Sequence, residues 1–119
     1  MKKIPDSEFE IMLIIWEAGE RVTADYIMER LDKTWQKTTV LNFLTRLCDR
    51  GFLKCGKEGR HNIYESLVDK NDYLKEESRS FFKKVHHNSI ISLVSSLYDG
   101  GEVPEEDLIM LKRYIGEAE

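Results

Sequence analysis

Residues 34–67 read TWQKTTVLNFLTRLCDRGFLKCGKEGRHNIYESL, and this stretch decides the fold of the 119-residue chain. Its first half carries apolar side chains at the i, i+3, i+4, i+7 spacing of one helix face, at Val40, Phe43, Leu44 and Leu47. The spacing predicts a helix that begins near Lys37 or Thr38. Gly51 follows the last turn and takes the C′ position, where a positive φ is commonly required.

The second half of this stretch predicts a β-hairpin. Strand-like runs at Phe52–Cys55 and Asn62–Leu67 flank a short polar turn, residues 56–60, which contains two glycines. Upstream of residue 34 we expect two further helices. One is capped by Asp6 or Ser7 and stopped by Gly19, and the other is capped by Thr23. Arg21-Val22 is interpreted as a short extended piece between them.

Three helices followed by an open two-stranded sheet form a winged helix-turn-helix. After Asp69 the pattern is wholly helical, with amphipathic stretches over 71–85 and 86–98 and a final helix that has Pro104 at N1. The fold class is therefore mainly α with a small β-hairpin: an N-terminal winged helix-turn-helix (three helices plus wing) followed by C-terminal dimerisation helices. The predicted domains are residues 1–68, which bind DNA, and residues 69–119, which dimerise.

The distribution of charge indicates a nucleic-acid partner, although the net charge of the chain is −4. Residues 33–60, the basic segment, hold seven basic and two acidic side chains, whereas the flanking segments are both acidic. Salt screens charges beyond about 8–10 Å, so a local basic surface can attract phosphate on an acidic protein.

In a helix-turn-helix, the second helix presents the outer face of its N-terminal part to base edges in the major groove. Asn can bond adenine bidentately, Thr can bond a base or phosphate, and Leu can touch a thymine methyl group. The candidate DNA-binding residues of this recognition helix are Lys37, Thr38, Thr39, Leu41, Asn42, Thr45 and Arg46. Arg46 and Arg50 are better placed for phosphate or an acidic neighbour. The alternative is a solvated helix face.

Lys57 and Arg60 flank the hairpin turn and are the candidate DNA-binding residues of the wing. Contacts of this kind position a protein on DNA without reading its sequence. A charged hairpin tip also protects edge strands from aggregation, so the wing alone is weak evidence.

The C-terminal helices carry more large apolar side chains than short helices can cover, which favours a homodimer. The candidate interface residues are Leu93, Val94, Leu97, Leu108, Leu111 and Ile115. The alternative is that this stripe folds back onto the winged helix as additional core.

Other function classes lack support in the sequence. No apolar run approaches the ~18 residues that span a membrane, and MKKIPDSEFE is no secretory signal, so a cytoplasmic location is expected. Cys48 and Cys55 form no disulfide framework and, with three scattered His, no converging metal site. We find no catalytic motif, so we expect no enzyme, no cofactor and no metal.

Three motifs carry a resemblance to a known family. The run T-W-x-x-x-T-V-x-x-F-L-T-R-L-C-D-R-G-F-L, Thr34 to Leu53, is similar to the penicillinase-repressor family (BlaI, MecI and CopY type). S-E-F-E-I-M-x-I-I-W, Ser7 to Trp16, resembles its first helix, and Y-E-S-L, Tyr64 to Leu67, resembles the close of its wing. The resemblance covers nearly the whole chain.

The resemblance implies a homodimeric transcriptional repressor that binds double-stranded DNA at a palindromic operator, with an unknown sensor or protease as a possible further partner. Thr38, Leu41 and Asn42 differ from the family's usual residues, so the operator sequence does not carry over. The Asn-Phe bond cleaved in β-lactam-responsive members corresponds here to Ser96-Leu97. The rival interpretation is a winged-helix module that binds protein and not DNA.

Overall fold

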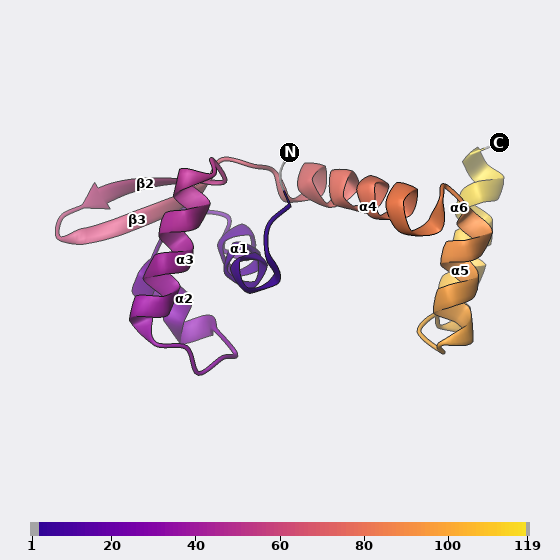
Figure 1. Cartoon of the computed structure of the whole chain (residues 1–119), viewed down its shortest axis with the longest axis horizontal. Helices are drawn as coiled ribbons and strands as arrows, with labels where there is room; N and C mark the ends of the chain where they lie inside the picture. Colours follow the sequence, from indigo (N-terminus) through magenta and orange to yellow (C-terminus); the bar gives the residue numbers. More distant parts are fainter. Residues whose placement is uncertain (1–2, 119) are drawn as a thin grey trace. The chain divides into compact units, whose positions relative to one another are not determined.

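The computed structural model describes residues 3–118 and holds six helices and three strands in that range. They are α1 (Asp6–Ala18), β1 (Val22–Thr23), α2 (Ala24–Arg30), α3 (Lys37–Asp49), β2 (Leu53–Glu58), β3 (His61–Ser66), α4 (Lys70–His86), α5 (Ile90–Asp99) and α6 (Glu105–Ala118) (Figure 1). The chain divides into two compact units, residues 1–77 and 78–119. The predicted boundary between residues 68 and 69 stays a prediction, and the outer ends of the two predicted domains, residues 1, 2 and 119, lie outside the described residues.

The core of the first unit lies where α1, α2 and α3 meet the sheet. Its fully buried side chains are Ile4 ahead of α1, Ile11 and Met12 on α1, Ile27 on α2, and Val40, Leu44 and Leu47 on α3. Those on α3 follow the predicted helical spacing. Phe43 is only half-buried and stacks edge-on against Trp35, with 5.3 Å between the ring centroids. The predicted arrangement of three helices and a hairpin is confirmed.

The sheet has three strands and not the two that we expected. Its order is β1-β3-β2 and every pair is antiparallel, with Val22 opposite Tyr64 on one side and Cys55 opposite Tyr64 on the other. The extended piece before α2 therefore pairs with the hairpin and ties it to the helices. This pairing joins residues far apart in the chain, which local sequence patterns do not reveal.

The hairpin turn is also shorter than the five residues predicted. Glu58 pairs with His61, so the loop is only Gly59-Arg60, and Lys57 lies on β2 opposite Asn62. Gly59 has a φ of +65°, a conformation that glycine adopts without steric cost. The hairpin therefore extends beyond the helices as a two-stranded arm (Figure 1).

The helix ends agree with the sequence in part. Thr23 caps α2 by accepting a hydrogen bond from the Tyr26 N–H at 3.1 Å, and Gly51 follows α3 with a φ of +85°, both as predicted. The predicted caps of α1, Asp6 and Ser7, are wrong. Both lie inside the helix, because the carbonyl of Pro5 already accepts from the Phe9 N–H.

The first break in the C-terminal helices, between α4 and α5, lies later than predicted. The structure continues α4 to His86 and starts α5 at Ile90, so a helix over 86–98 is wrong at its beginning. His87 and Asn88 take positive φ values of 49° and 62°, and Ser89 then caps α5 by accepting from the Ser92 N–H. Pro104 stands just before α6 and not at its first position, since its carbonyl accepts from Leu108.

The first turns of α4 belong to the core of the first unit. The Tyr73 side chain is buried and its ring lies within 6.2 Å of the rings of Phe9, Trp16 and Phe52. Its hydroxyl accepts a hydrogen bond of 2.8 Å from the backbone N–H of Ile4. The unit boundary therefore falls inside α4, after Glu77.

Changing Tyr73 to Phe should destabilise the protein by roughly 1–3 kcal/mol, because the buried Ile4 N–H loses its partner while the ring remains. Urea unfolding measures this difference. The matched control is Tyr98→Phe, where the side chain is 59 % exposed and a change within about 0.5 kcal/mol is expected. Equal stability of Tyr73→Phe and wild type would contradict the role of this hydrogen bond.

Candidate nucleic-acid interface

The outer face of α3, opposite its buried stripe, is polar and open to solvent. Five of the seven predicted recognition-helix residues are exposed, namely Lys37, Thr38, Asn42, Thr45 and Arg46. Thr39 and Leu41 are half-buried, and Leu41 packs against the core. The structure thus brings polar side chains together along one helix face. Only part of the Leu41 side chain is exposed, so a ligand could contact only that part.

Two side chains of this face are oriented by contacts within α3. The Thr45 hydroxyl donates to the Leu41 carbonyl at 3.0 Å, which leaves its oxygen lone pairs as acceptors. The Arg46 guanidinium lies 5.8 Å from the centroid of the Phe43 ring. Asn42 has both donor and acceptor groups on an exposed side chain, so it is the residue best suited to bidentate bonding with a base.

Lys37, at the first turn of α3, is already paired in the structure. Its Nζ lies 2.8 Å from Oδ1 of Asp25, at the start of α2. The hydrogen bond and the positive charge of Lys37 together hold the pKa of the Asp25 carboxyl below its usual range. The sequence did not predict Asp25 as a residue of this site, because no local pattern links residue 25 to residue 37.

A polar hollow of about 200 Å³ surrounds this pair, between the starts of α2 and α3 and the hairpin. It brings together side chains from three parts of the sequence: Thr23, Ala24, Asp25, Lys37, Leu41, Arg60, His61, Asn62 and Tyr64. The predicted wing residue Arg60 and the predicted recognition-helix residue Lys37 therefore line one site.

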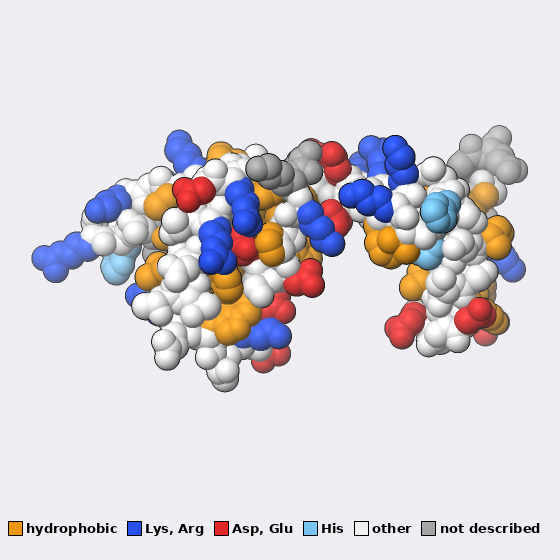
Figure 2. Space-filling model, in the orientation of Figure 1, with side chains coloured by type: hydrophobic (Ala, Val, Ile, Leu, Met, Phe, Trp, Pro, Cys, Tyr) orange, Lys and Arg blue, Asp and Glu red, His pale blue; other side chains and the backbone are white. Residues whose placement is uncertain are grey.

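The wing carries its cations at the end of the hairpin. Lys57 on β2 and Arg60 in the turn are both exposed, as is Lys54. Figure 2 shows blue Lys and Arg side chains that extend from the tip of the hairpin. An exposed cation on this arm can meet phosphate without a fixed geometry.

Arg50 is engaged inside the first unit. Its Nη1 lies 3.1 Å from Oε1 of Glu8, whose side chain is 3 % exposed. Of the two partners that the sequence suggested for Arg50, the structure shows the acidic neighbour. The pair stabilises the contact between α1 and the end of α3, and it removes one cation from those available to DNA.

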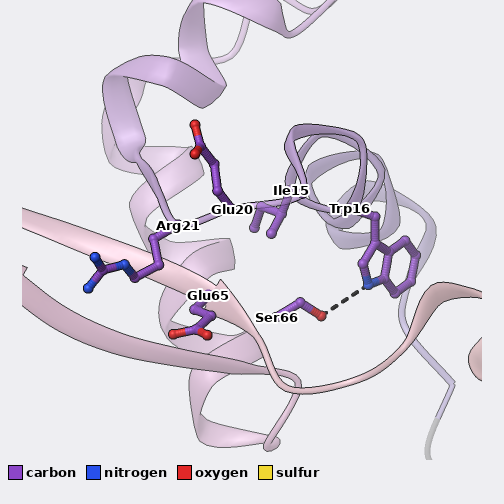
Figure 3. A pocket seen from close by; sticks show the side chains of 7 residues that line it. Ile15, Trp16, Glu20, Arg21, Glu65 and Ser66 are labelled. Atoms are coloured by element: carbon purple, nitrogen blue, oxygen red, sulfur yellow. Dashed lines mark hydrogen bonds between the residues drawn. The ribbon is translucent and has the colours of Figure 1, made fainter.

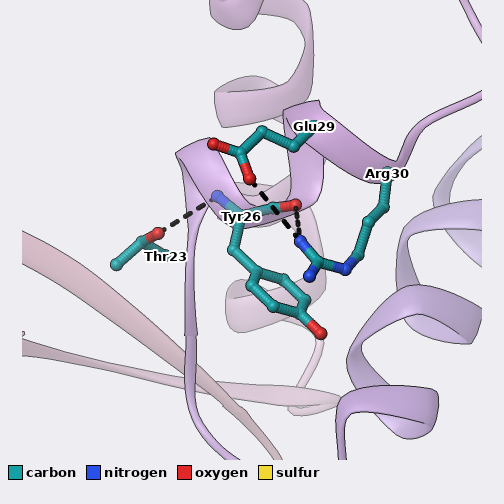
Figure 4. Close-up of polar contacts among 4 residues, drawn as sticks. All are labelled: Thr23, Tyr26, Glu29 and Arg30. Carbon is teal, nitrogen blue, oxygen red and sulfur yellow. Dashed lines mark hydrogen bonds and ion pairs between the residues drawn. The ribbon is translucent and has the colours of Figure 1, made fainter.

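The α2 helix is held in shape by its own polar contacts. Thr23 caps its first turn, and the Arg30 guanidinium lies 3.4 Å from the centroid of the Tyr26 ring and donates to the Tyr26 carbonyl (Figure 4). Glu29 pairs with the same guanidinium at 3.7 Å. These contacts lie between residues 23 and 30 and stabilise the short α2 helix itself.

A second hollow, of about 390 Å³, lies on another part of the first unit. Its lining residues are Ile15, Trp16, Gly19, Glu20, Arg21, Glu65 and Ser66 (Figure 3). The Trp16 Nε1–H donates to Ser66 Oγ at 3.0 Å and to the Val68 carbonyl at 2.9 Å. These bonds anchor the chain after β3, and the hollow contains none of the predicted DNA-binding residues.

The cysteines show no reactive arrangement. Burial raises the pKa of the Cys48 thiol to about 11, so this group stays protonated at neutral pH. Cys55 is exposed on β2, and neither cysteine forms a disulfide. Within residues 3–118, no cluster of three or more His, Cys, Asp or Glu side chains suits a metal ion. In the same range, no helix is long and apolar enough to cross a bilayer.

The six candidate interface residues lie on α5 and α6 in the second unit. Leu97, Leu111 and Ile115 are 42 %, 41 % and 50 % exposed, whereas Leu93, Val94 and Leu108 are half-buried. The most exposed apolar side chains of these helices are outside the predicted interface set: Ile90, Ile91, Tyr98, Ile109, Met110 and Tyr114. Their exposure depends on how α5 and α6 pack, which periodicity does not specify.

Known proteins match this chain over nearly its full length. The model of the family described as penicillinase repressor matches residues 4–117. The penicillinase repressor of Bacillus licheniformis is 30 % identical, over 98 % of this chain and 94 % of its own. The methicillin resistance regulatory protein MecI of Staphylococcus aureus (strain N315) is 28 % identical, over 95 % of this chain and 93 % of its own.

Solved structures match the first unit. The DNA-binding domain of the repressor BlaI, in solution, has a TM-score of 0.52 and 36 % identity, over 61 % of this chain and 94 % of that domain. The Bacillus licheniformis BlaI monomer, solved in complex with the blaP half-operator, has a TM-score of 0.50 and the same identity and coverage. The predicted winged helix-turn-helix is thereby confirmed.

Proposed function

The chain belongs to the penicillinase repressor family and is a transcriptional repressor that binds operator DNA, and we propose that it does so as a homodimer on a palindromic site. The family has no enzymatic activity, which agrees with the predicted absence of catalysis. Membership of a repressor family argues against the rival interpretation, a module that binds protein and not DNA.

The observation that carries this proposal is the exposed polar face of α3 beside a cationic hairpin. The outer face of α3 would enter the major groove, where Asn42 and Thr38 would meet base edges. Lys57 and Arg60 would hold phosphates from the hairpin. Lys37, Thr39, Leu41, Thr45 and Arg46 complete the proposed contact set.

The exposed apolar side chains of α5 and α6 support a second copy of the chain as the partner of the second unit. Burying one such side chain contributes roughly 1.5–3 kcal/mol, so several together can offset the cost of association. Figure 2 shows orange apolar side chains on these helices. In this proposal residues 1–68 bind DNA, and residues 69–119 dimerise and hold two recognition helices about one DNA turn, ~34 Å, apart.

Bound as a dimer over a promoter, the protein would repress by competing with RNA polymerase for the same DNA. We also propose that the protein acts in the cytoplasm, where it would meet the DNA that it represses. A signal that loosens α5 and α6 would lower affinity without changing a base contact. A sensor or protease acting on the second unit is the kind of partner that could deliver such a signal.

The affinity for a fragment of the upstream region of its own gene should fall steeply as the salt concentration rises. Each phosphate neutralised contributes about −0.9 to the slope of log affinity against log salt concentration, because counterions are released. Fluorescence anisotropy at several salt concentrations measures the slope, and protection mapping on the same fragment locates the site. A single continuous footprint without two-fold symmetry would contradict the palindromic operator.

Changing Asn42 to Ala should lower operator affinity by roughly 1–3 kcal/mol and relax the preference for one base, since a bidentate contact is lost. Changing Lys57 or Arg60 to Ala should instead weaken binding to all duplexes alike and reduce the salt slope by about one. Competition binding with single-base operator variants separates the two effects. A loss at Lys57 that depends on sequence would place the wing in a groove and not on the backbone.

Changing Leu97 to Asp should convert the dimer to monomers, because a charge placed in an apolar interface loses its hydration. Sedimentation velocity measures the oligomeric state. The control is Ser95→Asp, which adds the same charge to the exposed polar side of α5 and should leave the dimer intact. An intact dimer with Leu97→Asp would contradict the assignment of this residue to the interface.

A further inference from the structure

We propose that Asp25 is an internal competitor for DNA phosphate: in the free protein its carboxylate occupies Lys37, and DNA has to displace it. This inference rests on the proposed function, which includes Lys37 among the DNA contacts; its ammonium group, at the start of the recognition helix, would meet the phosphate backbone. It assigns to α2 a role in setting the affinity for all DNA, in addition to the support that it gives to α3.

The geometry of the pair matches that of a lysine bound to phosphate. The Nζ of Lys37 and the Oδ1 of Asp25 are 2.8 Å apart, the length of a charge-assisted hydrogen bond. The two side chains remain 54 % and 60 % exposed, so another anion can reach the ammonium group from solvent. A carboxylate oxygen thus stands where a phosphate oxygen would bind.

The surroundings of the pair indicate that this is a DNA-facing position. The same hollow is lined by Arg60, His61 and Asn62 of the hairpin and by Leu41 of α3. Asp25 is therefore an acidic side chain between the two proposed DNA-binding elements. Lys37, and to a lesser degree His61, lower the pKa of the Asp25 carboxyl, so it is negatively charged at neutral pH.

Binding of DNA would replace one ion pair by another and leave Asp25 close to phosphate. The released carboxylate is then repelled by the DNA and attracts a cation from solution. The uptake of that cation cancels part of the counterion release that Lys37 brings. Because phosphates are present on every duplex, the penalty applies equally to operator and unrelated DNA, and it keeps non-specific binding low.

The test compares Asp25→Asn with wild type on two probes, the fragment of its own upstream region and an unrelated duplex of equal length. Asp25→Asn should bind both about 1.5- to 5-fold more tightly at moderate salt, the range for an exposed ion pair, with a salt slope steeper by at most about 0.9. Glu29→Gln is the matched control, since it removes the same charge from α2 at a residue that pairs with Arg30. It should leave affinity and slope almost unchanged.

The double variant shows whether Asp25 acts through Lys37. Lys37→Gln should weaken binding to both probes, and adding Asp25→Asn to it should recover little, because no ammonium group remains to be released. A similar gain in the presence and absence of Lys37, or a gain with Glu29→Gln, would show a general charge effect and overturn the proposal. An unchanged affinity of Asp25→Asn would also overturn it. If Lys37→Gln itself binds as wild type does, the proposed contact of Lys37 is wrong, which is a distinct failure.

Discussion

The arrangement of the first unit depends on the burial of one stripe of α3. Val40, Leu44 and Leu47 are completely excluded from solvent, and each sits on the helix face that meets α1, α2 and the sheet. A helix cannot rotate about its axis without exposing such a stripe, at a cost of roughly 1.5–3 kcal/mol per side chain. The outward direction of Asn42 and Thr45 is therefore set by apolar residues that never touch a ligand. A recognition surface needs this kind of rigid support.

The distance from each cation to the nearest carboxylate, and not the net charge of the chain, decides whether that cation can attract phosphate. The net charge is −4, yet the wing presents Lys57 and Arg60 on an arm that extends away from the acidic helices. At physiological salt a carboxylate more than about 8 Å away has little effect on such a cation. Acidic groups matter only where they make direct contact, as Glu8 does with Arg50 and Asp25 does with Lys37. Lys33 of the basic segment also pairs, with Glu10 at 3.5 Å, so three of the seven cations of this segment contact a carboxylate of the first unit.

The features that the sequence predicted correctly are those with local signals. The periodicity of α3, the glycine after it and the Thr23 cap each depend on residues within one or two helical turns. The pairing of β1 with β3 brings Val22 opposite Tyr64, and no local pattern encodes which distant strand a two-residue segment will join. The break at His87-Asn88 lacks the Gly or Pro that usually marks one, and Asn is among the few other residues that enter the left-handed region readily. At the candidate site, the sequence predicted the exposed residues of α3, but it did not predict the ion pair of Lys37 with Asp25 on α2.

The number of cations exposed on α3 and the hairpin supports the proposal that the protein binds DNA as a homodimer. Arg50 is occupied by the buried Glu8, Lys37 is shared with Asp25, and the cations exposed on α3 and the hairpin are Arg46, Lys54, Lys57 and Arg60. With four or five phosphate contacts, a single winged helix gains an electrostatic term that decreases quickly as salt rises. In the proposed homodimer, two copies joined through α5 and α6 would double this term, and the second half-site would bind at the high effective concentration that the first imposes. In the proposed dimer, the apolar surface of the C-terminal helices and the modest charge of the recognition helix would complement each other, because association with a second copy would supply the cations that one chain lacks.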